Sequence, residues 1–466
     1  MEYRTEMEKT MENFYQKNEQ AGSVAFLTLG CKVNSYETNA MEKLFIEAGY
    51  EIKEFDDTAD VYVINTCTVT NMADRKSRQM LHKAKKKNKD AVIVAVGCYV
   101  QAAQEELKED SAIDLIVGNN QKKDIVALVE AYRQGTTLEE MKLPDMKQEQ
   151  SYEELQIEDA GEKTRAYIKI QDGCNQFCSY CIIPYVRGRI RSRNEEDIIQ
   201  EVKRVVSHGY KEVVLTGIHL SSYGVDLQGE KNFVALEGKP LLSIIEKVSE
   251  VKGLERIRLG SLEPRIITES FVKELSAIKK VCPHFHLSLQ SGCDATLKRM
   301  NRKYTSKDYE DGCQILRKYY DRPAITTDII VGFPEESEEE FLITKNFAKK
   351  IQFSDVHIFK YSMRKGTVAA RIKNQIPEQV KHQRSMELIA LGREMTRNYE
   401  SSFFKEPQNI LVEETIEIDG TFYETGHNER YMKLYVKKGE SENHGLIRMV
   451  EILEILEDGK IICRYI

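Results

Sequence analysis

Three cysteines with the spacing Cys-x3-Cys-x2-Cys, at Cys174, Cys178 and Cys181, come just after a strand-like segment. Three thiolates can ligate three irons of a [4Fe–4S] cluster and leave the fourth iron open to a small molecule. A tetrahedral zinc site normally needs four ligands, and no further Cys or His lies near this run in the sequence. The remaining alternative, three buried thiols without a metal, fits poorly with so dense a run. The spacing therefore predicts an iron–sulfur cluster with one open position.

A second set of cysteines is spread over the first part of the chain. Cys31, Cys67 and Cys98 each follow an apolar run, and stretches of helical pattern separate these runs. Alternating strands and helices of this kind predict a doubly wound parallel sheet in residues 21–135. The carboxyl ends of parallel strands share one edge, where ligands bind. A lone cysteine there would be a small buried residue, but three at equivalent positions predict a second cluster, again with an open iron.

A longer series of strand and helix patterns begins near Arg165. Six strand-like runs predict a (β/α)6 partial barrel in residues 164–400, with its chemistry at the carboxyl ends of the strands. These runs are 167–170, 212–215, 257–259, 285–289, 325–331 and 356–361.

The predicted strand ends hold residues suited to a small ligand. A glycine allows the backbone to approach a ligand, and a carboxylate can accept from an ammonium or a ribose hydroxyl. Each residue alone is also compatible with ordinary turn chemistry, but together they favour a cofactor site. The candidate residues are Gly217, Ser261, Glu263, Gln290 and Asp328.

Four arginines alternate with other residues just beyond the cysteine run: Arg187, Arg189, Arg191 and Arg193. In an extended strand they would form one cationic row. We expect this row to contact RNA phosphates, the alternative being a solvated edge. Residues 75–89 hold eight Lys or Arg and no acidic residue, and a solvated helix face explains them as well as an RNA-facing one does.

Short β runs predict a small all-β barrel in residues 401–466. This region has eight Lys or Arg against thirteen Asp or Glu, so its bulk charge does not favour RNA binding. The alternative is a local RNA-binding face around His427, Arg430, Lys433 and Lys437.

Composition sets the broad class. The 466 residues have a net charge of −7, which gives no global argument for nucleic-acid binding. Residues 1–20 form a polar tail without a signal-peptide core, no run is apolar enough for a membrane helix, and residues 136–163 have the composition of a linker. Ten cysteines in so long a chain are not a secreted disulfide framework. We therefore expect a multidomain α/β protein of the cytoplasm.

The segment 173–188, GCNQFCSYCIIPYVRG, resembles the methylthiotransferase branch of the radical S-adenosylmethionine (SAM) enzymes. The whole span 24–466 is similar to this family, with a methylthiotransferase N-terminal domain, a radical SAM domain and a TRAM-like domain. The motif GHNERYMKLYV at 426–436 resembles a TRAM domain, which implies tRNA contact.

The resemblance implies a reaction and two [4Fe–4S] clusters. The cluster at Cys174, Cys178 and Cys181 would bind SAM and, with one electron, yield a radical that removes a hydrogen from an unactivated carbon, with Tyr180 against the adenine. The second cluster, at the three earlier cysteines, would hold a sulfur that another SAM methylates and that joins the substrate. All six cysteines would be catalytic.

Two segments bear on the substrate: LGCKVNSYET at 29–38 and NTCTVTN at 65–71. They resemble the branch acting on N6-threonylcarbamoyladenosine at position 37 of the tRNA anticodon loop, with hydrogen abstraction at C2. The isopentenyladenosine branch tends to have Gln-Met-Asn where this chain has Lys32-Val33-Asn34. A branch modifying a ribosomal-protein aspartate is a third possibility. The family also implies an electron donor such as flavodoxin. The alternative of another class is a non-catalytic iron–sulfur protein that binds RNA. Such a protein would have no use for a SAM site, so the candidate cofactor residues at the strand ends would have no function.

Overall fold

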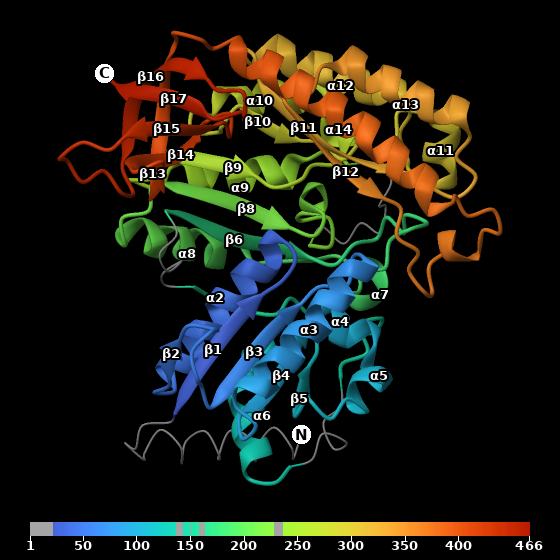
Figure 1. Cartoon of the computed structure of the whole chain (residues 1–466), viewed down its shortest axis with the longest axis vertical. Coiled ribbons are helices and arrows are strands. Elements are labelled where there is room, and N and C mark those ends of the chain that lie inside the picture. Colours follow the sequence, from blue (N-terminus) through green and yellow to red (C-terminus); the bar gives the residue numbers. More distant parts are fainter. Residues whose placement is uncertain (1–21, 137–142, 150, 158–163, 228–235) are drawn as a thin grey trace. The chain divides into compact units, whose positions relative to one another are not determined.

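The computed structural model describes residues 22–136, 143–149, 151–157, 164–227 and 236–466 (Figure 1). The predicted polar tail 1–20 lies outside the described residues. The chain forms two compact units. The N-terminal unit contains Met1–Asp159, Asp172–Asn175 and Cys181–Arg191, and the C-terminal unit contains Ala160–Gln171, Gln176–Tyr180 and Ser192–Ile466.

The N-terminal unit is built on a parallel five-stranded sheet in the order β2-β1-β3-β4-β5. Its strands are β1 (Ser23–Thr28), β2 (Glu51–Lys53), β3 (Val61–Thr66), β4 (Val92–Gly97) and β5 (Leu115–Val117). The short strand β2 was not predicted, because two of its three residues, Glu51 and Lys53, are charged. The predicted doubly wound parallel sheet is confirmed.

Alternate residues of the central strands face opposite sides of this sheet. Val61 and Val63 pack with α2 (Lys32–Glu47) and α6 (Ile125–Arg133). Tyr62 and Ile64 pack on the other face with α3 (Asn71–Lys87), α4 (Cys98–Ala102) and α5 (Gln104–Lys108). Because helices cover both faces, the central strands carry continuous hydrophobic runs instead of an alternation of apolar and polar residues.

The predicted linker packs against the N-terminal unit where it is described. Met146, Leu155 and Ile157 are buried, and the phenol of Tyr36 on α2 donates to the Leu155 carbonyl at 2.5 Å. Residues 143–149 and 151–157, the part of the linker that the structure describes, contain no strand.

The barrel of the C-terminal unit has its strands in two sheets, in which the six main strands pair in parallel. One has the order β7-β6-β8-β9 and the other β10-β11-β12, and a bridge between Leu262 and Leu287 joins them. The bounds are β6 (Arg165–Asp172), β7 (Arg191–Ser192), β8 (Glu212–Gly217), β9 (Arg256–Leu259), β10 (His284–His286), β11 (Ala324–Val331) and β12 (Asp355–Lys360). Six of these strands, β6 and β8 to β12, are the predicted barrel strands.

Helices alternate with the barrel strands (Figure 1). They are α8 (Glu195–Ser207), α9 (Lys239–Ser249), α10 (Glu269–Ala277), α11 (Asp294–Arg299), α12 (Ser306–Tyr319) and α13 (Glu338–Ile351). Capping boxes at Thr305 and Ser337 fix the starts of α12 and α13. The long helix α14 (Glu378–Ser401) was not predicted, and it packs against β12.

The last residues of the C-terminal unit close a small barrel in the order β13-β14-β15-β17-β16. Its strands are β13 (Pro407–Ile418), β14 (Thr421–Asn428), β15 (Lys433–Lys437), β16 (Ile447–Ile455) and β17 (Ile461–Tyr465). The pairing of β13 with β14 has an irregularity between Val412 and Glu414. No helix among the described residues is long and apolar enough to span a membrane.

Candidate active site

The N-terminal sheet brings Cys31, Cys67 and Cys98 to one edge. Cys31 precedes α2, Cys67 follows β3 and Cys98 opens α4, after three strands that neighbour one another in the sheet. Burial, together with the neighbouring Cys98 and Cys31, raises the pKa of Cys67 to about 11. Metal binding here must therefore displace a proton from Cys67.

Gly30 makes room for this cluster of thiols. Its φ is +110°, and a Cβ at this position would lie 2.9 Å from the Cβ and 3.1 Å from the Sγ of Cys67. Any side chain here would push Cys67 away, so the glycine before Cys31 is a steric requirement of the site.

Polar groups support two of the sulfur atoms. The Cys31 thiol donates to Asn34 Oδ1 at 3.6 Å, and Asn34 Nδ2 donates to the carbonyls of Leu29 and Thr66. Cys98 Sγ accepts from Arg187 Nε at 3.1 Å. The Arg187 N–H at Cys98 favours the thiolate form that ligates iron. Three convergent thiols in this setting fit a cluster with three protein ligands.

The prediction that four arginines form an exposed cationic row is wrong. Arg187, Arg191 and Arg193 are at most 1% exposed, whereas Arg189 is exposed. The row needs an extended strand, but β7 contains only Arg191–Ser192, and the chain turns at Gly188 with a φ of +73°. The buried guanidinium groups pair with carboxylates instead: Arg187 with Glu37 and Asp172, and Arg193 with Glu201. Of the four, Arg189 alone retains an exposed side chain to offer to RNA.

The loop after β6 holds Cys174, Cys178 and Cys181, and all three are partly exposed. Within the N-terminal unit, the Cys174 N–H donates to the Gly188 carbonyl at 3.1 Å. Gly173 has a φ of +71°, and a Cβ there would clash at 1.8 Å with the Arg189 carbonyl. Within the C-terminal unit, Arg302 Nη1 donates to Cys178 Sγ at 3.2 Å. Arg302 was missed in the sequence, because no spacing links it to the cysteines.

Glu263 lies buried at the end of the third barrel strand and is surrounded by cations. Arg265 Nε is 2.7 Å from it, Arg302 Nη2 3.3 Å and His219 Nε2 3.5 Å. Burial alone would raise the pKa of this carboxyl, but the neighbouring His219 and the charge of Arg302 hold it down at about 2. Glu263 is therefore a permanent carboxylate that Arg302 links to Cys178.

Asp328, on β11, is held between His286 and His357, each 3.3 Å away. Hydrogen bonds to Asp328 and Asp355 raise the pKa of His357 to about 10, so this imidazole is protonated at neutral pH. The three ligand atoms of His286, Asp328 and His357 lie within 4.8 Å of one another. A protonated His357 makes this set an ion-paired group rather than a ready metal site.

The other predicted cofactor residues lie at the strand ends with varied surroundings. Gly217 faces Gln171, whose Oε1 would be 2.8 Å from a Cβ at that glycine. The ring of Tyr180 packs edge-on against Phe333, with centroids 6.5 Å apart. Ser261 is exposed, and Gln290 is buried with a φ of +66°. Contact between these residues and a cofactor stays a prediction.

The RNA-binding face predicted on the C-terminal barrel is largely engaged within the protein. Lys433 Nζ lies 2.9 Å from Glu414, and His427 Nδ1 lies 2.7 Å from Glu413. Arg430 donates to the backbone carbonyls of Asp321 and Arg322. Lys433 keeps 40% of its side chain exposed and remains a candidate for RNA contact.

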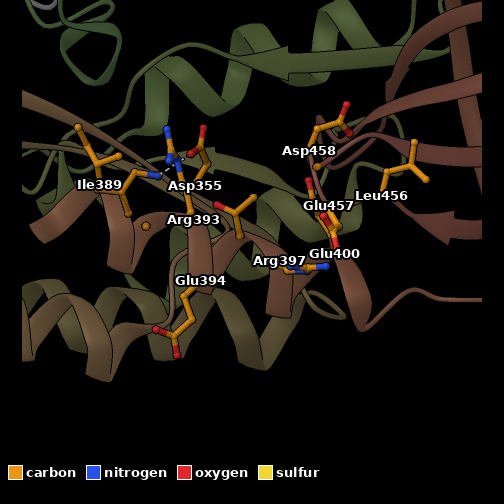
Figure 2. A pocket seen from close by; sticks show the side chains of 13 residues that line it. Asp355, Ile389, Arg393, Glu394, Arg397, Glu400, Leu456, Glu457 and Asp458 are labelled. Carbon is orange, nitrogen blue, oxygen red and sulfur yellow. Dashed lines mark hydrogen bonds between the residues drawn. The ribbon is translucent and has the colours of Figure 1, made fainter. Parts of the chain in front are cut away.

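A hollow of about 710 Å³ lies between α14, the start of β12 and the turn at Leu456–Gly459. Figure 2 shows Asp355, Ile389 and Arg393 on one side of it and Glu400, Glu457 and Asp458 on the other. Burial raises the pKa of Glu400 to about 7. Acidic side chains outnumber the two arginines of its lining, so it does not suit an RNA phosphate.

Two family models match the chain. Residues 23–118 match the model described as uncharacterized protein family UPF0004, and residues 168–348 match the radical SAM superfamily. The radical SAM methyltransferase TsrM from Kitasatospora setae has a similar fold, with a TM-score of 0.52 at 14% identity over 74% of this chain and 77% of that one. The barrel that holds Glu263 and Asp328 is thus a radical SAM domain, and the chain is an enzyme of that class, which uses a [4Fe–4S] cluster and SAM.

Curated relatives narrow the class. Threonylcarbamoyladenosine tRNA methylthiotransferase of Bacillus subtilis (strain 168) is 43% identical over 437 residues, 93% of this chain and 94% of that protein. The enzyme of the same name from Aquifex aeolicus (strain VF5) is 39% identical over 84% of this chain and 93% of its own length. The tRNA-2-methylthio-N(6)-dimethylallyladenosine synthase of Clostridium novyi (strain NT) is 35% identical over 84% of this chain and 86% of its own length. The chain belongs to the tRNA methylthiotransferase family, whose members contain two [4Fe–4S] clusters.

Proposed function

We propose that this enzyme converts N6-threonylcarbamoyladenosine at position 37 of tRNA to its 2-methylthio derivative. The main support is the convergence of Cys31, Cys67 and Cys98 at one sheet edge, which provides a thiol site besides the cysteine loop of the radical SAM domain. The choice of substrate rests on relatives of that name, which match over most of the chain.

In this proposal each group of residues has its own task. Cys174, Cys178 and Cys181 hold the cluster that binds SAM, and Cys31, Cys67 and Cys98 hold the second cluster. When bound, these groups supply the one-electron chemistry needed at an unactivated carbon, which acid–base side chains do not provide. The strand-end residues that orient SAM are Tyr180, Gly217, Ser261, Glu263, Gln290 and Asp328.

Further parts of the proposal concern the surroundings of the enzyme. Among the predicted RNA residues, Arg189, Lys433 and Lys437 retain exposure, and we assign Arg189 and Lys433 to the anticodon loop. The enzyme acts in the cytoplasm with an electron donor such as flavodoxin. The domains are those predicted, 21–135, 164–400 and 401–466, joined by the linker 136–163.

Nucleoside mass spectrometry of tRNA tests the proposal. Cells lacking this protein should lose 2-methylthio-threonylcarbamoyladenosine and accumulate its unmodified precursor. The wild-type gene and a Cys463→Ala variant should restore the product, because Cys463 is a buried core residue of the C-terminal barrel. Cys67→Ala should not restore it. Loss of 2-methylthio-isopentenyladenosine instead would support the alternative substrate named in the Clostridium relatives.

A further inference from the structure

A buried arginine lies directly behind the N-terminal thiol site. Arg187 is fully buried, and three of its nitrogen atoms have partners within the N-terminal unit. Nε donates to Cys98 Sγ at 3.1 Å, and Nη1 donates to Glu37 Oε1 at 2.8 Å and to Asp172 Oδ2 at 3.1 Å. Nη2 donates to Asn34 Oδ1 at 2.9 Å and to Glu37 Oε2 at 3.0 Å. This guanidinium thus contacts a proposed cluster ligand and Asn34, the residue that accepts from Cys31.

The charges around Arg187 form a closed group. Lys122 is also fully buried and lies 3.4 Å from Glu37 and 3.7 Å from Glu153. It donates to Asn119 Oδ1 at 2.8 Å, and Asn119 Nδ2 lies 3.9 Å from Cys98 Sγ. Burial of a charge pair costs much desolvation energy, and well-packed apolar residues of similar volume often stabilise a fold equally well. The placement of the charge pair against a thiolate suggests a task at that sulfur.

We propose that Arg187 is a positioning residue that orients Cys98 and sets the reduction potential of the cluster held by Cys31, Cys67 and Cys98. The inference rests on the proposed ligand role of these cysteines. A positive charge and an N–H donor at a ligand sulfur stabilise the electron-rich, reduced state of an iron–sulfur cluster. Glu37 opposes this effect with its negative charge and at the same time holds the guanidinium against Cys98.

The test uses the full chain in a background in which Cys174, Cys178 and Cys181 are replaced by Ala, so that one cluster remains. After anaerobic reconstitution, iron is counted and the midpoint potential is measured by a redox titration followed by electron paramagnetic resonance. Arg187→Gln should lower the potential and Glu37→Gln should raise it. We expect at least a tenfold change in the reduction equilibrium, about 59 mV for one electron.

Controls separate tuning from a loss of structure. Arg187→Lys keeps the charge and should give a smaller shift than Arg187→Gln. Arg193→Gln removes a guanidinium that is equally buried and pairs with Glu201, and it should leave the potential unchanged. If Arg187→Gln assembles no cluster, Arg187→Lys and Glu37→Gln still provide the measurement.

Two results would overturn this inference without affecting the proposed ligand set. They are unchanged potentials in the variants, or shifts of the same sign for Arg187→Gln and Glu37→Gln. A background protein that binds no iron before any change at Arg187 would overturn the proposed ligand set as well. Because the potential is measured without tRNA, the test does not depend on which nucleoside the enzyme modifies.

Discussion

The positions of the Cys31, Cys67 and Cys98 side chains depend on neighbouring residues that are not proposed to bind iron. Gly30 provides space beside Cys67, Asn34 bonds to Cys31 and Arg187 bonds to Cys98. Each of these contacts acts over less than 4 Å, so single substitutions should disturb one cluster and leave the other intact.

Gly30→Ala should remove the second cluster while the fold survives. The new methyl group would lie 2.9 Å from the Cβ of Cys67, at a backbone φ of +110°. We expect iron in the reconstituted protein to fall from about eight atoms per chain to about four. Gly49→Ala is the matched control, because its φ is +86° with no atom within 4 Å of the added methyl group. The Gly49→Ala variant should lose about 1 kcal/mol of unfolding free energy to backbone strain, as Gly30→Ala does, and should keep all its iron. Equal iron loss in both variants would show that the contact with Cys67 is irrelevant.

The C-terminal barrel is joined to the radical SAM domain by an aromatic and charged contact on one element, the turn after β14. The ring of Tyr431 lies 4.8 Å from the guanidinium of Arg258 and 5.3 Å from that of Arg165. Arg165 and Arg258 also pair with Glu212, whose pKa is held at about 2, against the effect of burial, by the charges of these arginines. The element that resembles a TRAM motif is therefore also a docking element.

Tyr431→Ala should loosen this docking. The loss of two cation–π contacts and a half-buried ring should lower the free energy of unfolding by about 3 kcal/mol. Limited proteolysis should then release the segment beyond α14 faster than in the wild type. Tyr435→Ala, on β15, removes a ring that faces Lys433 of the same barrel and should not speed this cleavage. Unchanged proteolysis of the Tyr431 variant would contradict a docking role.

On the scale of the whole molecule, two sets of three cysteines imply two separable activities. One set follows β6, and the other follows strands of the N-terminal sheet. Family membership assigns two clusters to the enzyme, and the proposal divides them between these sets.

Cys174→Ala should abolish reductive cleavage of SAM, because the remaining two cysteines of its set would no longer hold the cluster. Cys67→Ala should abolish sulfur insertion and leave measurable cleavage. Cleavage is measured as 5′-deoxyadenosine released with a chemical reductant, and insertion as the methylthio nucleoside formed in tRNA. The division of roles fails if Cys67→Ala stops cleavage as completely as Cys174→Ala does.

Much of the architecture could be read from the chain order of its residues. Apolar runs followed by Cys31, Cys67 and Cys98 were enough to predict a parallel sheet with three thiols at one edge, because strand ends in such a sheet coincide. The spacing of Cys174, Cys178 and Cys181 pointed in the same way to a cluster loop. These features are local or strictly periodic, so they can be recognised from the sequence alone.

Tertiary structure decided what the charged residues do. Alternation predicted that Arg187, Arg191 and Arg193 would face RNA, but the chain turns at Gly188 and all three are buried. Arg187 pairs with Glu37, which is far away in the sequence, and Arg193 pairs with the nearby Glu201. Arg302, far from Cys178 in sequence, could be linked to it only through the fold. The reason is physical: strand and helix periods are short-range properties of the chain, whereas the partner of a buried charge is whichever opposite charge the fold brings within 4 Å.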